Sequence, residues 1–291
     1  MKIKYPISKF YEGMTIFDYM NCFHLGKSKI EYLSNYLYLN GQKASLDSIV
    51  QANDILEIDY LEEVDFLPDK KKLDIVYEDD YLLIVNKPTH ILVHPDDKNK
   101  QGTMCNIVSY YYQNKGIELS VKYAHRLDMD TTGLLIFVKD ALVHAKIDEM
   151  ISLHKLKRTY LCLVIGKLKD KSGTIDLPIG KDRHHNQRRR VSKTGKPAKT
   201  YYEVLEEFGK YSLLKVVLST GRTHQIRVHL KHIGHPLLGD VLYGEDSLVA
   251  SRVLLHSFQI NFIHPVTMEE IQIVKKVPFD MAKFIRGEQY K

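Results

Sequence analysis

Short apolar segments dominate the chain beyond residue 72 and constrain its fold more than any other feature. They follow one another in consecutive runs instead of alternating strictly with helices, which favours an α+β domain built on a mainly antiparallel sheet. Helices are expected at 103–114, 141–153 and 223–233, with N-caps at Thr103, Asp140 and Thr223. The expected strands cover 73–77, 81–85, 121–127, 134–138, 157–166, 200–206, 211–218 and 253–263.

Residues 1–60 indicate a smaller unit with the order helix, helix, hairpin. Thr15 and Ser28 are the expected N-caps of its helices, and Asn40-Gly41 suits a tight turn between strands. Residues 61–72 lose periodicity, carry a proline and end in three lysines, as a linker does. We therefore expect a small domain at 1–60, a linker at 61–72 and a main domain at 73–291.

The overall composition is that of a soluble globular protein. Of the 291 residues, 44% are hydrophobic and 27% are charged. No stretch approaches the roughly 20 apolar residues of a membrane helix, and the first ten residues lack the apolar core of a secretory signal. The three cysteines, Cys22, Cys105 and Cys162, are far apart and form no metal or disulfide pattern. We expect a monomer in the cytoplasm.

Positive charge is concentrated in one segment. Residues 181–200 hold eight Lys or Arg and one Asp, whereas the whole chain has a net charge of only +6. Such a run commonly contacts phosphates, because displacing counterions from nucleic acid is favourable for any sequence. A solvated loop is the alternative. Arg188, Arg189 and Arg190 are the candidate phosphate contacts.

The stretch H-R-L-D-M-D-T-T-G, from His125 to Gly133, places charged groups at a turn between two strands. We expect a strand to carry residues 125–128 to its end, and residues 134–138 to return into the core. Either Asp128 or Asp130 could simply bond turn amides, which is a common role of Asp.

A second stretch, L-S-T-G-R-T-H-Q-I-R-V-H-L, begins at Leu218 and leads into the third helix. Helix N-termini attract anions, and the neighbouring Arg222 would strengthen such a site. The anion could be a phosphate or the Asp128 carboxylate. The alternative is an amphipathic helix with Ile226, Leu230 and Ile233 inward, which leaves Arg222 unexplained.

Together these stretches resemble the RluA-type pseudouridine synthases. The resemblance rests on H-R-L-D-x-x-T-[ST]-G, G-R-T-H-Q-I-R-x-H-L and G-H-P-x-x-G-D, and covers about residues 73–270. Shorter pieces fit in order, among them Y-E-D-D-Y-L-L-I-V-N-K-P from Tyr77 and K-R-T-Y-L from Lys157. Thr132 stands where Ser is usual.

The resemblance implies that the protein isomerises uridine in structured RNA, with ribosomal large-subunit RNA as the first expected substrate and tRNA as the second. It implies Asp128 as the essential carboxylate, Tyr160 as the aromatic residue beside the target base and Arg222 as the cation paired with the aspartate. The reaction requires no redox step or group donor, so we expect no cofactor and no metal. Further RNA contacts are expected at His125, Arg126, Thr132, Thr223, His224, Arg188, Arg189 and Arg190. Arg126 is a candidate to fill the space of an extruded base, or alternatively to pair with Asp130.

Residues 1–60 resemble the small RNA-binding domain of ribosomal-protein type that often precedes this catalytic domain. They hold six Lys, no Arg and seven acidic residues, whereas the resemblance leads one to expect a basic helix. A packing or partner-docking role therefore remains open.

Two other functions compete with this interpretation. Fourteen histidines suggest a metalloenzyme, with His90 and His94, or His224, His229, His232 and His235, as ligands, but no H-E-x-x-H or equivalent spacing is present. The other candidate is a catalytically silent RNA-binding or ribosome-associated protein on the same fold. It would not need Asp128, Tyr160 and Arg222 together, because binding requires basic groups and not a carboxylate facing phosphates.

Overall fold

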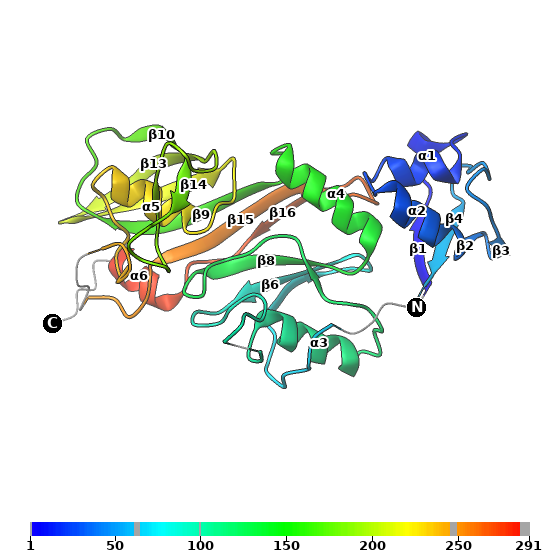
Figure 1. Cartoon of the computed structure of the whole chain (residues 1–291), viewed down its shortest axis with the longest axis horizontal. Helices are drawn as coiled ribbons and strands as arrows, with labels where there is room; N and C mark the ends of the chain where they lie inside the picture. The colour runs from blue at the N-terminus through cyan, green and yellow to red at the C-terminus, as the bar shows by residue number, and fades with distance from the viewer. Residues whose placement is uncertain (1, 61–64, 99, 245–248, 286–291) are drawn as a thin grey trace.

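The computed structural model describes residues 2–60, 65–98, 100–244 and 249–285. A ten-stranded sheet forms the centre of the main unit, residues 65–285, with the order β10-β13-β14-β9-β15-β8-β6-β5 and with β16 and β7 attached to β15 and β8. All of its paired strands are antiparallel except β15 and β8. The expected α+β class is confirmed (Figure 1).

Every expected segment of the main unit overlaps a helix or a strand, but the helix at 279–285 and the strands at 172–176, 179–181, 189–191 and 270–274 were not expected. Its helices are α3 (Met104–Asn114), α4 (Ala141–Ser152), α5 (Gln225–His232) and α6 (Phe279–Ile285). Its strands are β5 (Ile75–Glu78), β6 (Leu82–Lys87), β7 (Lys122–Tyr123), β8 (Thr132–Val138), β9 (Lys157–Ile165), β10 (Ser172–Asp176), β11 (Ile179–Lys181), β12 (Arg189–Val191), β13 (Lys199–Phe208), β14 (Tyr211–Leu218), β15 (Leu255–Ile263) and β16 (Glu270–Val274). Thr103 and Asp140 cap α3 and α4 as expected. The strand expected at 121–127 is reduced to two residues.

Helices cover both faces of the sheet. Along β8, Leu134 and Ile136 face the cluster that contains α4, whereas Leu135 and Phe137 face the cluster that contains α3 and α5. All seven residues of β8 are consequently buried. Because β8 lies between two other strands and is buried on both faces, the turn that leads into it is anchored at that end.

Gly133 allows β8 to approach β15. It has φ +107°, and a Cβ there would lie 2.3 Å from the carbonyl oxygen of Ser257. Any other residue would push the two parallel strands apart. The glycine of the T-T-G turn therefore fixes the point at which the chain enters the sheet.

The N-terminal unit, residues 2–60, has its own four-stranded sheet in the order β1-β4-β2-β3. Thr15 caps α1 through the amide of Asp18, whereas α2 begins at Lys27 with Gly26 in the cap position, so the expected cap at Ser28 is wrong. Asn40 and Gly41 form the hairpin turn with positive φ, as expected. The elements are β1 (Lys2–Pro6), a 3₁₀ turn (Lys9–Tyr11), α1 (Ile16–Asn21), α2 (Lys27–Ser34), β2 (Leu37–Leu39), β3 (Gln42–Lys43) and β4 (Ile55–Asp59).

The N-terminal unit shares a hydrophobic core with the main unit. One cluster joins residues such as Ile3 and Leu56 to Leu82 and Leu142 of the main unit. Polar contacts reinforce this junction: the hydroxyl of Tyr5 donates a 2.6 Å hydrogen bond to Asp140. In Figure 1 the unit lies beside α4 and the turn between β15 and β16. The expected boundary at residues 61–72 therefore separates two sheets that share one hydrophobic core. Residues 61–64 of this expected linker lie outside the described residues.

Replacing Tyr5 by Phe tests this shared core. Asp140 is fully buried, and the loss of a buried hydrogen bond to it should lower the free energy of unfolding by about 1–3 kcal/mol. Denaturant unfolding followed by the fluorescence of tyrosine would measure this loss. The matched control is Tyr201→Phe, because Tyr201 is 41% exposed and its change should be close to neutral. Equal effects of the two substitutions would contradict a shared core.

Candidate active site

Two buried basic side chains, Lys87 and Arg252, donate hydrogen bonds to the backbone of the turn that carries Asp128. Lys87, at the end of β6, donates 2.8 Å hydrogen bonds to the carbonyls of Pro88 and Met129. Arg252 donates to the carbonyl of Asp130 at 3.4 Å and is itself held by Asp280 of α6. The Asp128 side chain, 24% exposed, is thus presented at the surface by a turn whose backbone is anchored in the core.

Burial lowers the pKa of Lys87 to about 7, and the charges of Asp130 and Asp128 oppose this shift. A lysine with this pKa can exchange its proton near neutral pH. The negative charges of Asp130 and Asp128 therefore reach the Lys87 amino group beneath the turn.

Arg227 of α5 is the cation that pairs with Asp128. Its Nη1 donates to Asp128 Oδ2 at 3.3 Å, while Nε and Nη2 donate to the two oxygens of Asp240 at 2.8 Å. Asp240 is fully buried and also accepts from the amides of Leu242 and Tyr243. Burial lowers the pKa of Arg227, but Asp240 and then Asp128 raise it overall, so the guanidinium stays charged. Asp240 therefore fixes Arg227, and Arg227 orients Asp128.

The expected ion pair between Arg222 and Asp128 is wrong. Arg222 is exposed, and its Nε donates to the carbonyl of Pro197 at 3.0 Å. The reason is a later helix start: His224 adopts φ +58°, so α5 begins at Gln225 and not at Thr223. Thr223 is exposed and caps nothing, and Arg227 instead lies on the inward face with Ile226 and Leu230. The sequence contained a signal for the pair of Arg227 and Asp128: Arg227 falls on the apolar face of the predicted helix, and a buried charge there needs a charged partner.

Tyr160 enters the site from β9. It is 4% exposed, and burial raises the pKa of its phenol, with Arg158 lowering it and Asp128 raising it. The ring therefore stays protonated and lies within the electrostatic reach of Asp128. The role expected for Tyr160 beside a bound base stays a prediction.

His224 and Arg189 meet on Tyr243. The Tyr243 hydroxyl accepts a 2.7 Å hydrogen bond from the Arg189 amide and lies 2.8 Å from His224 Nδ1. Its ring is also 5.1 Å from the Arg227 guanidinium. Burial lowers the pKa of His224, and the Asp128 charge opposes this change. The hairpin of β11 and β12, which carries the basic segment, is consequently joined to the Asp128 site and is not a free loop.

The other expected contacts divide into surface and core residues. Arg126 is exposed and lies 3.1 Å from His94, whose ring stacks on Tyr123. Its alternative partner, Asp130, instead lies 2.9 Å from His90. Arg188 and Arg189 are half-buried and Arg190 is exposed.

Two of the expected RNA contacts are buried in the RNA-free protein, and their contact with RNA stays a prediction. His125 is 7% exposed, since residues 125–128 alternate inward and outward and place it beside Leu127 on the inner side. Thr132 is 6% exposed, and its hydroxyl lies 2.9 Å from His256 Nδ1 between β8 and β15. Both side chains shape the turn from within.

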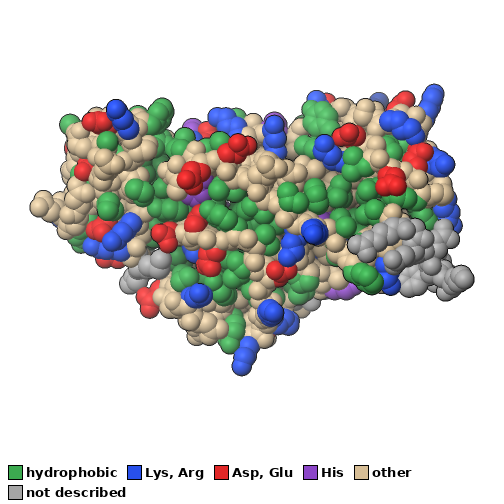
Figure 2. Space-filling view, turned by 180° about the vertical axis from the view of Figure 1, so that it is seen from behind, with side chains coloured by type: hydrophobic (Ala, Val, Ile, Leu, Met, Phe, Trp, Pro, Cys, Tyr) green, Lys and Arg blue, Asp and Glu red, His purple; other side chains and the backbone are tan. Residues whose placement is uncertain are grey.

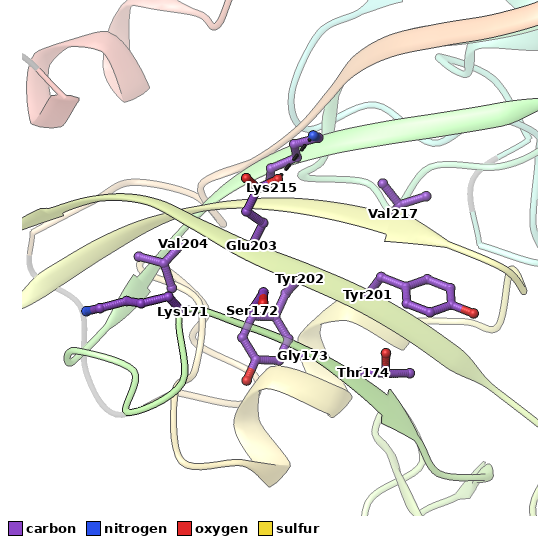
Figure 3. A pocket seen from close by; sticks show the side chains of 10 residues that line it. All are labelled: Lys171, Ser172, Gly173, Thr174, Tyr201, Tyr202, Glu203, Val204, Lys215 and Val217. Carbon is purple, nitrogen blue, oxygen red and sulfur yellow. Dashed lines mark hydrogen bonds and ion pairs between the residues drawn. The ribbon is translucent and has the colours of Figure 1, made fainter.

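A cavity of about 620 Å³ lies elsewhere, over β10, β13 and β14 (Figure 3). Figure 3 shows Tyr201 and Tyr202 in its lining and the Lys215–Glu203 ion pair at its edge. None of its lining residues belongs to the Asp128 site, and each of its charged groups is paired: Lys215 with Glu203, and Lys171 with Glu207 outside the lining. It therefore gives no reason to place chemistry there.

Within the described residues, no group of three or more His, Cys, Asp or Glu is arranged to hold a metal ion. Over the same residues, no helix combines the length and apolar character needed to cross a membrane.

Comparisons with known proteins agree with this geometry. A family model described as RNA pseudouridylate synthase matches residues 81–232. The chain is 42% identical to the uncharacterized RNA pseudouridine synthase YhcT of Bacillus subtilis, over 85% of this chain and 83% of that protein. It is 36% identical to ribosomal large subunit pseudouridine synthase D of Salmonella typhimurium, over 85% and 77%.

A solved structure, human RNA pseudouridylate synthase domain containing 1, superposes with a TM-score of 0.60 at 26% identity, over 72% of this chain and 84% of that one. The family match spans the segment that carries the Asp128 turn, Tyr160 and Arg227. The chain belongs to the RNA pseudouridylate synthase family, in its RluA-type branch, and is an isomerase that converts uridine to pseudouridine in RNA.

Proposed function

We propose that this enzyme modifies specific uridines in structured ribosomal large-subunit RNA, with tRNA as the second candidate, and that Asp128 is its catalytic carboxylate. The single observation that carries the catalytic assignment is the chain of contacts from buried Asp240 through Arg227 to the partly exposed Asp128. The pairing with Arg227 fixes the direction of the carboxylate, and its partial exposure leaves it accessible to a substrate.

The reaction can be written with the residues of this site. The bond between uracil N1 and the sugar C1′ breaks, the base turns, and C5 of the ring bonds to C1′. N1 then carries a proton, and the hydrogen on C5 leaves as a proton. Ionised Asp128 can either attack C1′ or remove a proton from the sugar. Tyr160 offers a flat, neutral face that retains the detached base.

Reaching a uridine in folded RNA requires its extrusion, at a cost of a few kcal/mol. Arg126 supports this step, since it is exposed, planar and two residues from Asp128. Its neighbour His94 stacks on Tyr123, so the guanidinium lies at the edge of a pair of stacked rings. Stacking in the vacated position is the role we assign to it.

The names of several relatives support this substrate class. Several proteins that resemble the chain over most of its length are named as ribosomal large subunit pseudouridine synthases. Mapping pseudouridines in all cellular RNAs, with and without this protein, tests the proposal directly. Loss of modification at defined large-subunit positions would support it. If the purified protein binds RNA but no position in any RNA depends on it, the proposed function is wrong.

The basic hairpin should supply phosphate contacts. On the face drawn in Figure 2, Lys and Arg side chains are interspersed with Asp and Glu, so that face offers no comparable concentration of positive charge. The hairpin around Arg188, Arg189 and Arg190 is anchored to Tyr243 beside the site.

Replacing Arg188, Arg189 and Arg190 together by Gln should weaken RNA binding and reduce its dependence on salt. The slope of log affinity against log salt should become shallower by about 0.7 to 0.9 for each RNA phosphate that the hairpin no longer neutralises. Conversion of bound RNA in a single turnover should persist. Replacing Lys169, Lys171 and Lys210, which lie elsewhere on the surface, provides the control. An unchanged slope would show that the hairpin does not touch the RNA.

A further inference from the structure

Arg158 is a buried cation without a counter-charge. It lies on β9 two residues before Tyr160, so both side chains project from the same face of the strand. Arg158 is only 6% exposed, and its Nε is fully buried without a hydrogen-bond partner. Within the described part of the chain it forms no ion pair. Burying an unpaired guanidinium is costly, so a partner from outside the protein is expected to complete it.

No neighbouring group among the described residues supplies the missing charge. Burial, and after it the charge of Arg158, lowers the pKa of His125 well below its ordinary value, so His125 is neutral. Asp128, the acid of the neighbouring turn, is paired with Arg227. Both terminal amino groups of Arg158 therefore have no partner in the part of the chain that the structure describes.

The two terminal amino groups lie next to the position above Gly221. A Cβ built on Gly221 would lie 3.8 and 4.0 Å from Arg158 Nη2 and Nη1, and no other described atom outside the glycine's own chain neighbours would lie within 4 Å. Gly221 is exposed and stands in the loop that enters α5. A space lined by a guanidinium and the backbone at a helix start suits a tetrahedral oxyanion.

We propose that Arg158 binds a backbone phosphate of the RNA in the space over Gly221, next to the nucleotide that reacts. This inference rests on the proposed function, because it takes RNA as the ligand. The guanidinium offers two parallel donors that match two phosphate oxygens. A phosphate held there would fix the sugar of the reacting uridine relative to Tyr160 and Asp128, so Arg158 is a positioning and binding residue.

Three variants test the proposal. Arg158→Met removes the charge and keeps most of the length of the side chain. Gly221→Ala puts a methyl group into the proposed phosphate space, at ordinary contact distance from Arg158 and without a strained backbone. Lys157→Met is the matched control, since Lys157 is exposed and projects from the opposite face of β9.

The first measurement is the thermal unfolding of each RNA-free protein. Because Arg158 is unpaired there, Arg158→Met should leave the melting temperature unchanged or raise it. A purely structural Arg158 would instead lower it. Gly221→Ala should stay within a few degrees of the parent protein, and it keeps the test valid should Arg158→Met fail to fold.

The second measurement is affinity for an RNA stem-loop that contains a uridine converted by the wild-type protein. A series of these RNAs replaces each phosphate near that uridine, one at a time, by a neutral methylphosphonate. For wild-type protein and Lys157→Met, a methylphosphonate at one phosphate position should lower the RNA affinity about tenfold, as expected for the loss of a charge-assisted hydrogen bond. Arg158→Met and Gly221→Ala should bind the unmodified RNA about tenfold more weakly and lose nothing further at that position. Arg158→Lys should recover part of the affinity.

A lower melting temperature for Arg158→Met, together with a methylphosphonate profile equal to that of the wild-type protein, would overturn the phosphate site. So would wild-type affinity in Gly221→Ala. These results are distinct from failure of the proposed function, in which the wild-type protein would convert no uridine in any RNA.

Discussion

Asp128→Asn should abolish pseudouridine formation while leaving the protein folded. The change is nearly isosteric and keeps the turn, because Lys87 and Arg252 bind its backbone carbonyls and not the Asp128 carboxylate. With excess enzyme, the single-turnover rate should fall by about four orders of magnitude or more, as when a group that performs the chemistry is removed. RNA affinity should stay within about tenfold, since affinity comes mainly from phosphates bound elsewhere on the protein.

Asp130→Asn is a stringent control for this prediction. Asp130 lies in the same turn, its side chain is 26% exposed against 24% for Asp128, and it pairs with His90 instead of an arginine. Its substitution should leave most of the activity. Conversion by Asp128→Asn near the wild-type rate, or equal losses in the two variants, would rule out Asp128 as the catalytic carboxylate.

Arg227→Lys should produce the second largest effect. Lysine keeps a positive charge but cannot bind both oxygens of Asp240 and reach Asp128 at the same time. The conversion rate should fall about 100- to 1,000-fold, the size found when one preorganised donor is removed from an active site. Single-turnover conversion and thermal unfolding of the same preparation would separate lost orientation from lost folding.

The matched substitution Arg222→Lys distinguishes the two arginines of the G-R-T-H-Q-I-R stretch. Arg222 is exposed, and its side chain bonds only the carbonyl of Pro197 among the described residues, so its loss should cost less than about tenfold. A larger loss for Arg222→Lys than for Arg227→Lys would contradict the pairing that the structure shows.

The family and its α+β class could be predicted from the sequence because they depend on local patterns. The apolar runs in 134–138 and 211–218 predict buried strands, and the caps at Thr103 and Asp140 mark helices within a residue. The order of strands could not be predicted. The segment 255–263 inserts between β8 and β9, which precede it by about a hundred residues, and no local pattern encodes such pairing.

The shared core of the two units could not be predicted either. Composition separates residues 1–60 from the rest, but a hydrophobic side chain does not record which unit will cover it. Tyr5 and Asp140 are 135 positions apart and meet only after both sheets have formed. The edge strand β1 was missed for a related reason, since its pattern is short and its pairing with β4 is distant.

For the candidate active site, the sequence by itself determined the residue types proposed for this chemistry and the segments that carry them: Asp128 at a turn, Tyr160 on a strand and an arginine near the start of α5. The tertiary structure decided which arginine pairs with Asp128. A single left-handed residue, His224, delays the helix and turns Arg222 outward, so that Arg227 lies on the buried face against Asp240. The tertiary structure also buries His125 and Thr132 beneath the turn. Residue chemistry is local and readable in order along the chain, whereas the direction of a side chain depends on backbone angles and on partners distant in the sequence.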